Sequence, residues 1–115
     1  MTLAVIGGTG FGAFAGLTET KDHAIETDFG PAEIQSGRLQ GQALLFLPRH
    51  GMPARFLPHK INYRANIKAL QMLGASRVLA VTAVGTVSED LRVPCLVVPD
   101  QIIDYTDGRA LTFFE

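Results

Sequence analysis

Three short segments of the chain carry residues that could bind an anion. In Gly7-Gly8-Thr9-Gly10, glycines allow backbone N–H groups to converge and Thr9 adds a hydroxyl donor. In Arg49-His50-Gly51, a guanidinium can hold two phosphate oxygens and an imidazole can donate a further hydrogen bond. The third segment, Thr82-Ala83-Val84-Gly85-Thr86, offers hydroxyls and backbone amides. Taken singly, each segment fits an ordinary glycine turn or a solvated surface as well or better.

The position of these segments in the sequence strengthens the anion interpretation. Each lies at the end of an apolar run typical of a buried strand, namely Leu3–Ile6, Ala43–Leu47 and Arg77–Val84. Open α/β sheets place their ligands at the carboxyl ends of the strands. The histidines have no ligand spacing with each other or with Cys95. Three donor-bearing loops without a cluster of metal ligands therefore predict a bound phosphate and no metal.

Further elements must position these loops. Glu33–Leu39 and Ala43–Leu47 flank Gln40-Gly41, which predicts two strands joined by a tight hairpin. Phe29-Gly30-Pro31 predicts a turn, and the polar stretch Thr18–Asp22 before it does not favour a helix.

A helix is predicted after Asn62, which is a plausible N-cap. Tyr63, Ile67 and Leu70 recur on one face of it, and Gly74 ends it. Leu96–Val98 and Gln101–Asp104 have strand-like composition. The order of strand, hairpin, helix, strand and strand predicts an α/β fold with a mixed β-sheet flanked by helices.

Composition excludes several classes of protein. The 115 residues suit one small domain, and 47% hydrophobic residues can form a packed core. The net charge is −1, and the sequence has no basic stripe of the kind that binds nucleic acid. No apolar run approaches the roughly 18 residues that a membrane-spanning helix needs. The single cysteine, Cys95, excludes an internal disulfide and is expected to be a buried small hydrophobe. A cytoplasmic protein is expected.

A dinucleotide-binding fold is a weaker alternative. Gly8-x-Gly10-x-x-Ala13 fits the loose fingerprint, which requires an uninterrupted helix next. Gly12 and Gly16 interrupt that helix.

The chain resembles the trimeric purine nucleoside phosphorylases, in particular their methylthioadenosine/methylthioinosine phosphorylase branch. Five motifs carry the resemblance in the same order over nearly all 115 residues: Ile6-Gly7-Gly8-Thr9-Gly10, Arg49-His50-Gly51, Pro58-His59-Lys60-Ile61-Asn62-Tyr63-Arg64-Ala65-Asn66, Thr82-Ala83-Val84-Gly85 and Asp100-Gln101-Ile102-Ile103-Asp104. Asp104-Tyr105-Thr106-Asp107-Gly108-Arg109 resembles the bacterial members that act on methylthioinosine. Ala54 and Val93-Pro94-Cys95 depart from the family pattern.

The resemblance implies phosphorolysis of a purine nucleoside to the free base and a sugar 1-phosphate, as in purine and methylthioadenosine salvage. It implies that phosphate is a co-substrate, that no cofactor or metal is required, and that Thr9, Arg49, His50, Thr82 and Ala83 hold the phosphate. It also implies a homotrimer or hexamer for the whole enzyme.

Residues 1–115 are expected to be the N-terminal, phosphate-binding part of a single domain. The residues that bind the base would lie in a C-terminal half that is absent from this chain. The chain alone is therefore expected to be inactive. A non-catalytic assembly remnant is the alternative.

Overall fold

The computed structural model describes residues 1–11 and 13–114, and it divides the chain into two units. The first unit is Met1–Ala83 and the second is Val84–Glu115. The first unit holds all the strands and helices that are found in the described residues. None of these helices is both long enough and apolar enough to cross a membrane.

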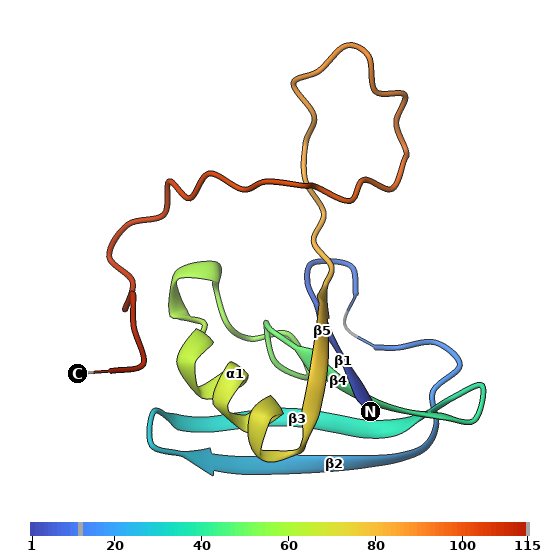
Figure 1. Ribbon diagram of the computed structural model, residues 1–115, viewed down its shortest axis with the longest axis vertical. Helices are drawn as coiled ribbons and strands as arrows, with labels where there is room; N and C mark the ends of the chain where they lie inside the picture. The colour runs from blue at the N-terminus through green and yellow to red at the C-terminus, as the bar shows by residue number, and fades with distance from the viewer. Residues whose placement is uncertain (12, 115) are drawn as a thin grey trace. The chain divides into compact units, whose positions relative to one another are not determined.

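A five-stranded mixed sheet forms the first unit, with the strand order β2-β3-β4-β1-β5 (Figure 1). The central strand β1 pairs in parallel with β4 on one side and β5 on the other, whereas β2, β3 and β4 pair antiparallel. The prediction of a mixed sheet is thereby confirmed. The strands are β1 (Thr2–Gly7), β2 (Thr18–Thr27), β3 (Gly30–Leu39), β4 (Gln42–Pro48) and β5 (Ala75–Ala80).

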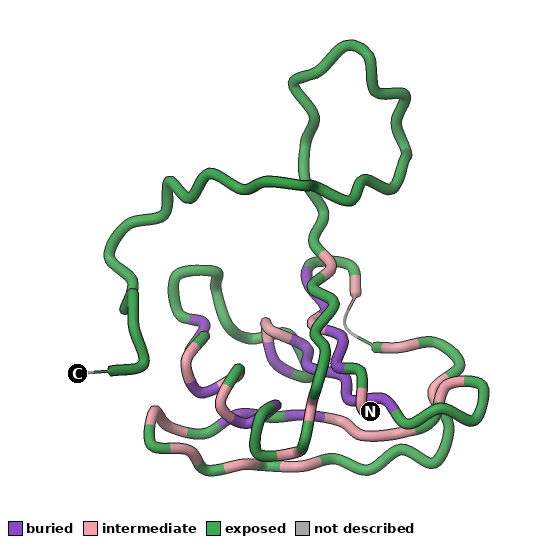
Figure 2. The backbone as a smooth tube through the Cα atoms, viewed as in Figure 1, coloured by how far each residue is buried: buried purple, intermediate pink, exposed green. Residues whose placement is uncertain are grey.

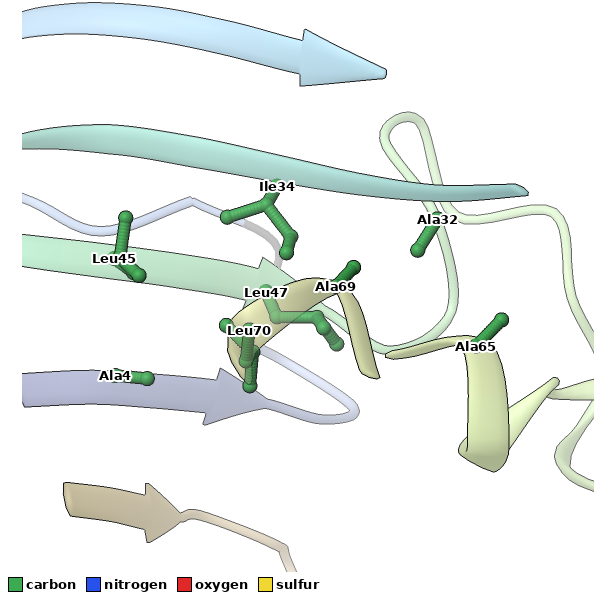
Figure 3. Close-up of a cluster of buried hydrophobic side chains, with 8 residues drawn as sticks. All are labelled: Ala4, Ala32, Ile34, Leu45, Leu47, Ala65, Ala69 and Leu70. Atoms are coloured by element: carbon green, nitrogen blue, oxygen red, sulfur yellow. The ribbon is translucent and has the colours of Figure 1, made fainter. Parts of the chain in front are cut away.

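Strand β4 is buried on both faces, which explains its unbroken apolar sequence. Alternate side chains of a strand point to opposite faces. Leu45 and Leu47 accordingly join a cluster with the helix, and this cluster contains Ala4, Ala32, Ile34, Ala65, Ala69 and Leu70 (Figure 3). Leu44 and Phe46 pack on the other face with Val5, covered by aromatic rings of the segment after β1.

Helix α1 (Tyr63–Met72) packs against β3, β2 and β5 and begins after the N-cap Asn62, as predicted. The Asn62 side chain accepts a hydrogen bond from the Ala65 N–H at 3.1 Å and donates one to the Phe29 carbonyl at 2.7 Å. A short 3₁₀ turn, η1 (Pro58–Lys60), precedes the helix. Gly74, with φ of +80°, follows it in the left-handed conformation typical of a helix end.

The apolar residues that recur on one face of the helix are only partly buried. Leu70 is buried, but Tyr63 and Ile67 are 37% and 41% exposed. The buried positions are instead Ala65, Ala69 and Leu70. Small alanine side chains allow the helix to lie close to the sheet, and a search for large apolar residues overlooks them.

The hairpin between β3 and β4 was predicted correctly. Its two turn residues, Gln40 and Gly41, have φ of 49° and 79°, and two positive values match the twist of a tight hairpin. Strand β2 was missed because it is polar. It lies at the edge of the sheet, where charged side chains discourage pairing with other chains.

Two predictions about the later part of the chain were also wrong. Strand β5 ends at Ala80 and not at Val84, because only the Val81 N–H still pairs with β1, through the Ile6 carbonyl at 2.9 Å. Leu96–Val98 and Gln101–Asp104 form no strand and are exposed, as is the whole described part of the second unit (Figure 2). Strand propensity needs a partner strand and a covered face, and these segments have neither in the described structure. Cys95 is exposed and not buried.

Replacing Leu70 with alanine should destabilise the first unit. Leu70 is 1% exposed within the helix–sheet cluster, so we expect Leu70→Ala to lower the free energy of unfolding by about 2–5 kcal/mol. Met72→Ala is the control, since Met72 is 55% exposed and its loss should change stability by less than about 0.5 kcal/mol. Urea unfolding followed by circular dichroism measures both, and equal effects would contradict the burial assigned to Leu70.

Candidate anion-binding site

The parallel pairing of β1 brings three loops to one edge of the sheet. Gly7 lies opposite Pro48 of β4, and Ile6 lies opposite Ala80 of β5, so the carboxyl ends of all three strands are level. The segments that follow these ends begin at Gly8, Arg49 and Val81. They contain Thr9, Arg49, His50 and Thr82, the side chains that were predicted from the sequence to bind an anion.

One cavity of about 390 Å³ gathers most of the predicted phosphate ligands. Thr9, Arg49, His50 and Thr82 all line it, whereas Ala83 does not. The remaining lining residues come from the strand ends, the loop before α1 and the exposed side of α1, and they are Ile6, Leu47, Pro58, Tyr63, Asn66, Ile67 and Ala80. The exposure of Tyr63 and Ile67 thus has a structural reason, since both form a wall of this cavity. That the cavity holds phosphate stays a prediction.

Arg49 is fixed in place by both neighbouring loops. Its Nη1 donates to the Val81 carbonyl at 3.0 Å and its Nη2 donates to Thr82 Oγ1 at 3.0 Å. Its backbone N–H donates to the Gly7 carbonyl at 3.1 Å. A guanidinium has five N–H donors, so the side chain retains donors for an oxyanion after making these two bonds.

Gly8 provides the space that the Arg49 side chain occupies. A Cβ atom at Gly8 would overlap the carbon and both terminal nitrogens of the guanidinium. Gly8 is itself buried, so the arginine lies directly over the backbone of the glycine loop. The sequence indicated that these glycines suit a tight turn or the convergence of backbone N–H groups on an anion, but not that the Arg49 side chain packs on Gly8.

His50 is held by a compact loop. Its Nδ1 lies 2.8 Å from the Phe56 carbonyl, and its own backbone carbonyl accepts N–H groups from Arg55 at 2.7 Å and Phe56 at 2.9 Å. Gly51 permits this fold with a φ of +84°. The other ring nitrogen, Nε2, is buried and has no hydrogen-bond partner among the described residues. A buried polar atom left without a partner costs about 1–3 kcal/mol.

A second cavity of about 420 Å³ adjoins the first and shares Thr9, His50 and Pro58 with it. Its wall combines the glycine loop with apolar side chains, including Phe11, Phe56 and Leu57. No carboxylate lines either cavity in the part of the chain that the structure describes, and the cations on their walls are Arg49 and Arg55. Positive side chains without an opposing carboxylate favour an anion, and the apolar wall of the second cavity favours an uncharged group next to that anion.

A third cavity of about 250 Å³ lies between the start of β3 and the start of α1. Arg49 lines it together with Lys60, Asn62 and the ion pair of Arg55 with Glu33. Because Glu33 already pairs with Arg55, it is not available to oppose an anion held by Arg49.

The acidic side chains do not form a metal site in the described residues. No three His, Cys, Asp or Glu side chains among residues 1–11 and 13–114 lie close enough together to hold a metal ion. In the second unit, hydrogen bonds from the Thr106 backbone and hydroxyl hold the pKa of Asp104 below its ordinary value. This carboxylate is exposed and stabilises its own turn.

The dinucleotide alternative is not supported by the fold. Residues 13–17 form turns and no helix, and the chain then enters β2, which pairs antiparallel with β3. A dinucleotide-binding unit requires a helix after the glycine loop and then a parallel strand. Gly12 itself lies outside the described residues.

The family profile and the related sequences point to the same family of proteins. The sequence profile of the phosphorylase superfamily matches residues 2–115. A probable S-methyl-5′-thioinosine phosphorylase of Xanthomonas campestris is 47% identical over 117 residues, covering 100% of this chain and 47% of the relative. An S-methyl-5′-thioadenosine phosphorylase of Hyperthermus butylicus is 50% identical, covering 98% of this chain and 42% of the relative. The chain therefore spans less than half the length of these relatives.

Solved structures show the same likeness. Methylthioadenosine phosphorylase from Schistosoma mansoni in complex with adenine superposes with a TM-score of 0.73 at 34% sequence identity. The match covers 79% of this chain and 34% of that structure. The mixed sheet with its helix is therefore part of the fold of that phosphorylase.

A double-mutant cycle tests the packing of Arg49 on Gly8. We expect Gly8→Ala to displace the guanidinium and to lower the free energy of unfolding by about 1–3 kcal/mol, since two hydrogen bonds of about 0.5–1.5 kcal/mol each are lost. In an Arg49→Ala background the same change should have little effect, because its steric partner is gone.

Gly85→Ala is the matched control for this cycle. A Cβ atom there meets nothing within 4 Å, and Gly85 does not have a positive φ. Additive effects of Gly8→Ala and Arg49→Ala in urea unfolding would contradict the contact.

Proposed function

The chain belongs to the phosphorylase superfamily, and on that basis we propose that it forms the phosphate-binding part of a purine nucleoside phosphorylase. The nucleoside is 5′-methylthioinosine or 5′-methylthioadenosine. The products are the free base and 5-methylthioribose 1-phosphate. The names of the relatives support this choice of substrate, since they include a probable methylthioinosine phosphorylase and a methylthioadenosine phosphorylase.

One observation carries the proposal. Thr9, Arg49, His50 and Thr82 come from three loops separated widely in the sequence, yet they line a single cavity. All four residues offer polar groups that can bind oxygen, and no carboxylate of the described wall opposes an anion there. Ala83 follows Thr82 directly and would contribute its backbone. This arrangement suits a tetrahedral oxyanion bound from several sides.

The chemistry that we propose needs no protein nucleophile. When the bond between sugar and base weakens, positive charge develops on the sugar ring. A phosphate held below that ring stabilises the charge and is already positioned to attack the anomeric carbon. Arg49 and His50 would fix its orientation, and the apolar wall of the adjoining cavity suits an uncharged substituent such as a methylthio group.

Recognition of the base is proposed to require residues outside this chain. The chain covers only 42–47% of the relatives quoted above. We therefore expect residues 1–115 to bind phosphate without releasing base, and we propose that the whole enzyme assembles as a homotrimer or hexamer.

An assembly role without catalysis is the second candidate. Several large apolar side chains of the second unit are more than four-fifths exposed, among them Leu96, Val98 and Phe114. Exposed apolar groups in such number are typical of surfaces that become covered by a partner. A monomer in sedimentation that melts cooperatively would count against this alternative.

Base release tests the reaction itself. Residues 1–115 would be joined to the remaining C-terminal part of the Xanthomonas campestris relative, and the chimera incubated with methylthioinosine, methylthioadenosine or inosine. We expect base release that depends on added phosphate, whereas the chain alone should release none. A folded chimera that binds phosphate but releases no base from any of the three would exclude the assignment.

Phosphate binding by the chain should depend on the planar guanidinium group of Arg49. Lysine keeps the charge of Arg49 but cannot bind two oxygens in the fixed geometry of a guanidinium. We expect Arg49→Lys to weaken phosphate binding by about tenfold or more, because a hydrogen bond to a charged group contributes about 1.5–3 kcal/mol. Isothermal titration calorimetry measures the change.

Arg38→Lys serves as the control for this measurement. Arg38 lies on β3 and pairs with Glu19 at 3.2 Å, away from the cavity. Its replacement should leave phosphate affinity unchanged. Unchanged affinity in Arg49→Lys would show that only the charge of this side chain matters, and equal weakening by the two variants would show that the effect is not specific to the cavity.

A further inference from the structure

The two nitrogens of the His50 ring are not equivalent. Nδ1 faces the Phe56 carbonyl at 2.8 Å, and a carbonyl oxygen can only accept a hydrogen bond. Nδ1 must therefore carry the hydrogen atom. A neutral imidazole has one N–H group, so Nε2 presents a lone pair and acts as an acceptor.

The surroundings of the ring leave this lone pair without a donor. Nε2 is buried and unpartnered among the described residues. The charged or titratable groups on the walls of the two cavities that His50 lines are Arg49, Arg55 and Tyr63, and no carboxylate is among them. The arginines attract an anion, whereas Nε2 requires that the group it meets bring a hydrogen atom.

Only some oxyanions meet both requirements. Phosphate and sulfate are both tetrahedral, and a guanidinium binds either of them. At neutral pH phosphate keeps at least one P–OH group, whereas sulfate has lost both of its hydrogens. A sulfate oxygen brought to Nε2 would place two lone pairs against each other.

We propose that His50 determines the choice of anion in this site, by accepting a hydrogen bond from a P–OH group at Nε2. The Phe56 carbonyl sets this selectivity because it fixes the tautomer. The inference rests on the proposed phosphate site, and it adds that the bound species is a hydrogen-bearing oxyanion and not any tetrahedral anion. Because Nε2 is buried, the proposed contact requires a small shift of the ring or of the glycine loop. The same contact would supply the missing partner of a buried atom.

Two measurements on the chain test the proposal. Nitrogen-15 NMR of the imidazole rings should show His50 as the Nδ1–H tautomer without ligand. Titration calorimetry at neutral pH should then show phosphate binding about tenfold or more tightly than sulfate, the ratio expected for one hydrogen bond to a charged group. His50→Gln should bring this ratio close to one, because an amide can turn to present either its oxygen or its N–H₂ group.

His23→Gln is the matched control. His23 lies on β2 with its Nε2 at 2.8 Å from Ser36 Oγ, and it lines neither cavity. Its replacement should leave the phosphate-to-sulfate ratio unchanged.

An Nε2–H tautomer, or equal affinities of the unaltered chain for the two anions, would overturn the proposal. If neither anion binds, the phosphate site and the selectivity both fail. If phosphate is preferred but no chimera releases base, only the proposed reaction fails.

Discussion

The structure depends on the parallel hydrogen bonding of β1 to both of its neighbours. Parallel strands run in the same direction, so the loops that follow β1, β4 and β5 emerge at one edge of the sheet. Thr9, Arg49 and Thr82 line one cavity for this reason. Register is equally important, because the pairing of Gly7 with Pro48 and of Ile6 with Ala80 makes the three strand ends level. A shift of one residue would turn the buried side chains of a strand to the opposite face.

Small residues allow the remaining parts to approach this edge. Ala65 and Ala69 bring α1 onto the sheet, so that Tyr63 and Ile67 of the same helix form a wall of the cavity. Gly8 leaves room for the Arg49 side chain, which then joins the end of β4 to the segment after β5. The same elements therefore stabilise both the core and the candidate site. The helix that covers the sheet also forms one wall of the cavity, and the glycine loop that follows β1 makes room for the arginine.

The features that follow from local sequence were predicted well, and those that depend on distant partners were not. Glycine and cap chemistry is local, so the Gln40–Gly41 turn and the Asn62 cap were found from the sequence. Apolar runs next to glycines located the three loops. The length of β5 and the absence of strands at 96–98 and 101–104 depend on whether a neighbouring strand exists, which propensity does not report. The group that orients His50 is the backbone carbonyl of Phe56, and a backbone contact of this kind cannot be predicted from residue types.

The hairpin turn at Gln40 and Gly41 has a practical consequence. It lies at the amino end of β4, whereas the cavity lies at the carboxyl end of that seven-residue strand, roughly 20 Å away along the backbone. Gln40 is exposed and already carries a side chain in this turn, whereas the φ of +79° at Gly41 disfavours any residue other than glycine there. A fluorophore or an affinity tag attached at position 40 would therefore report on the folded sheet from the far edge while leaving the anion loops untouched.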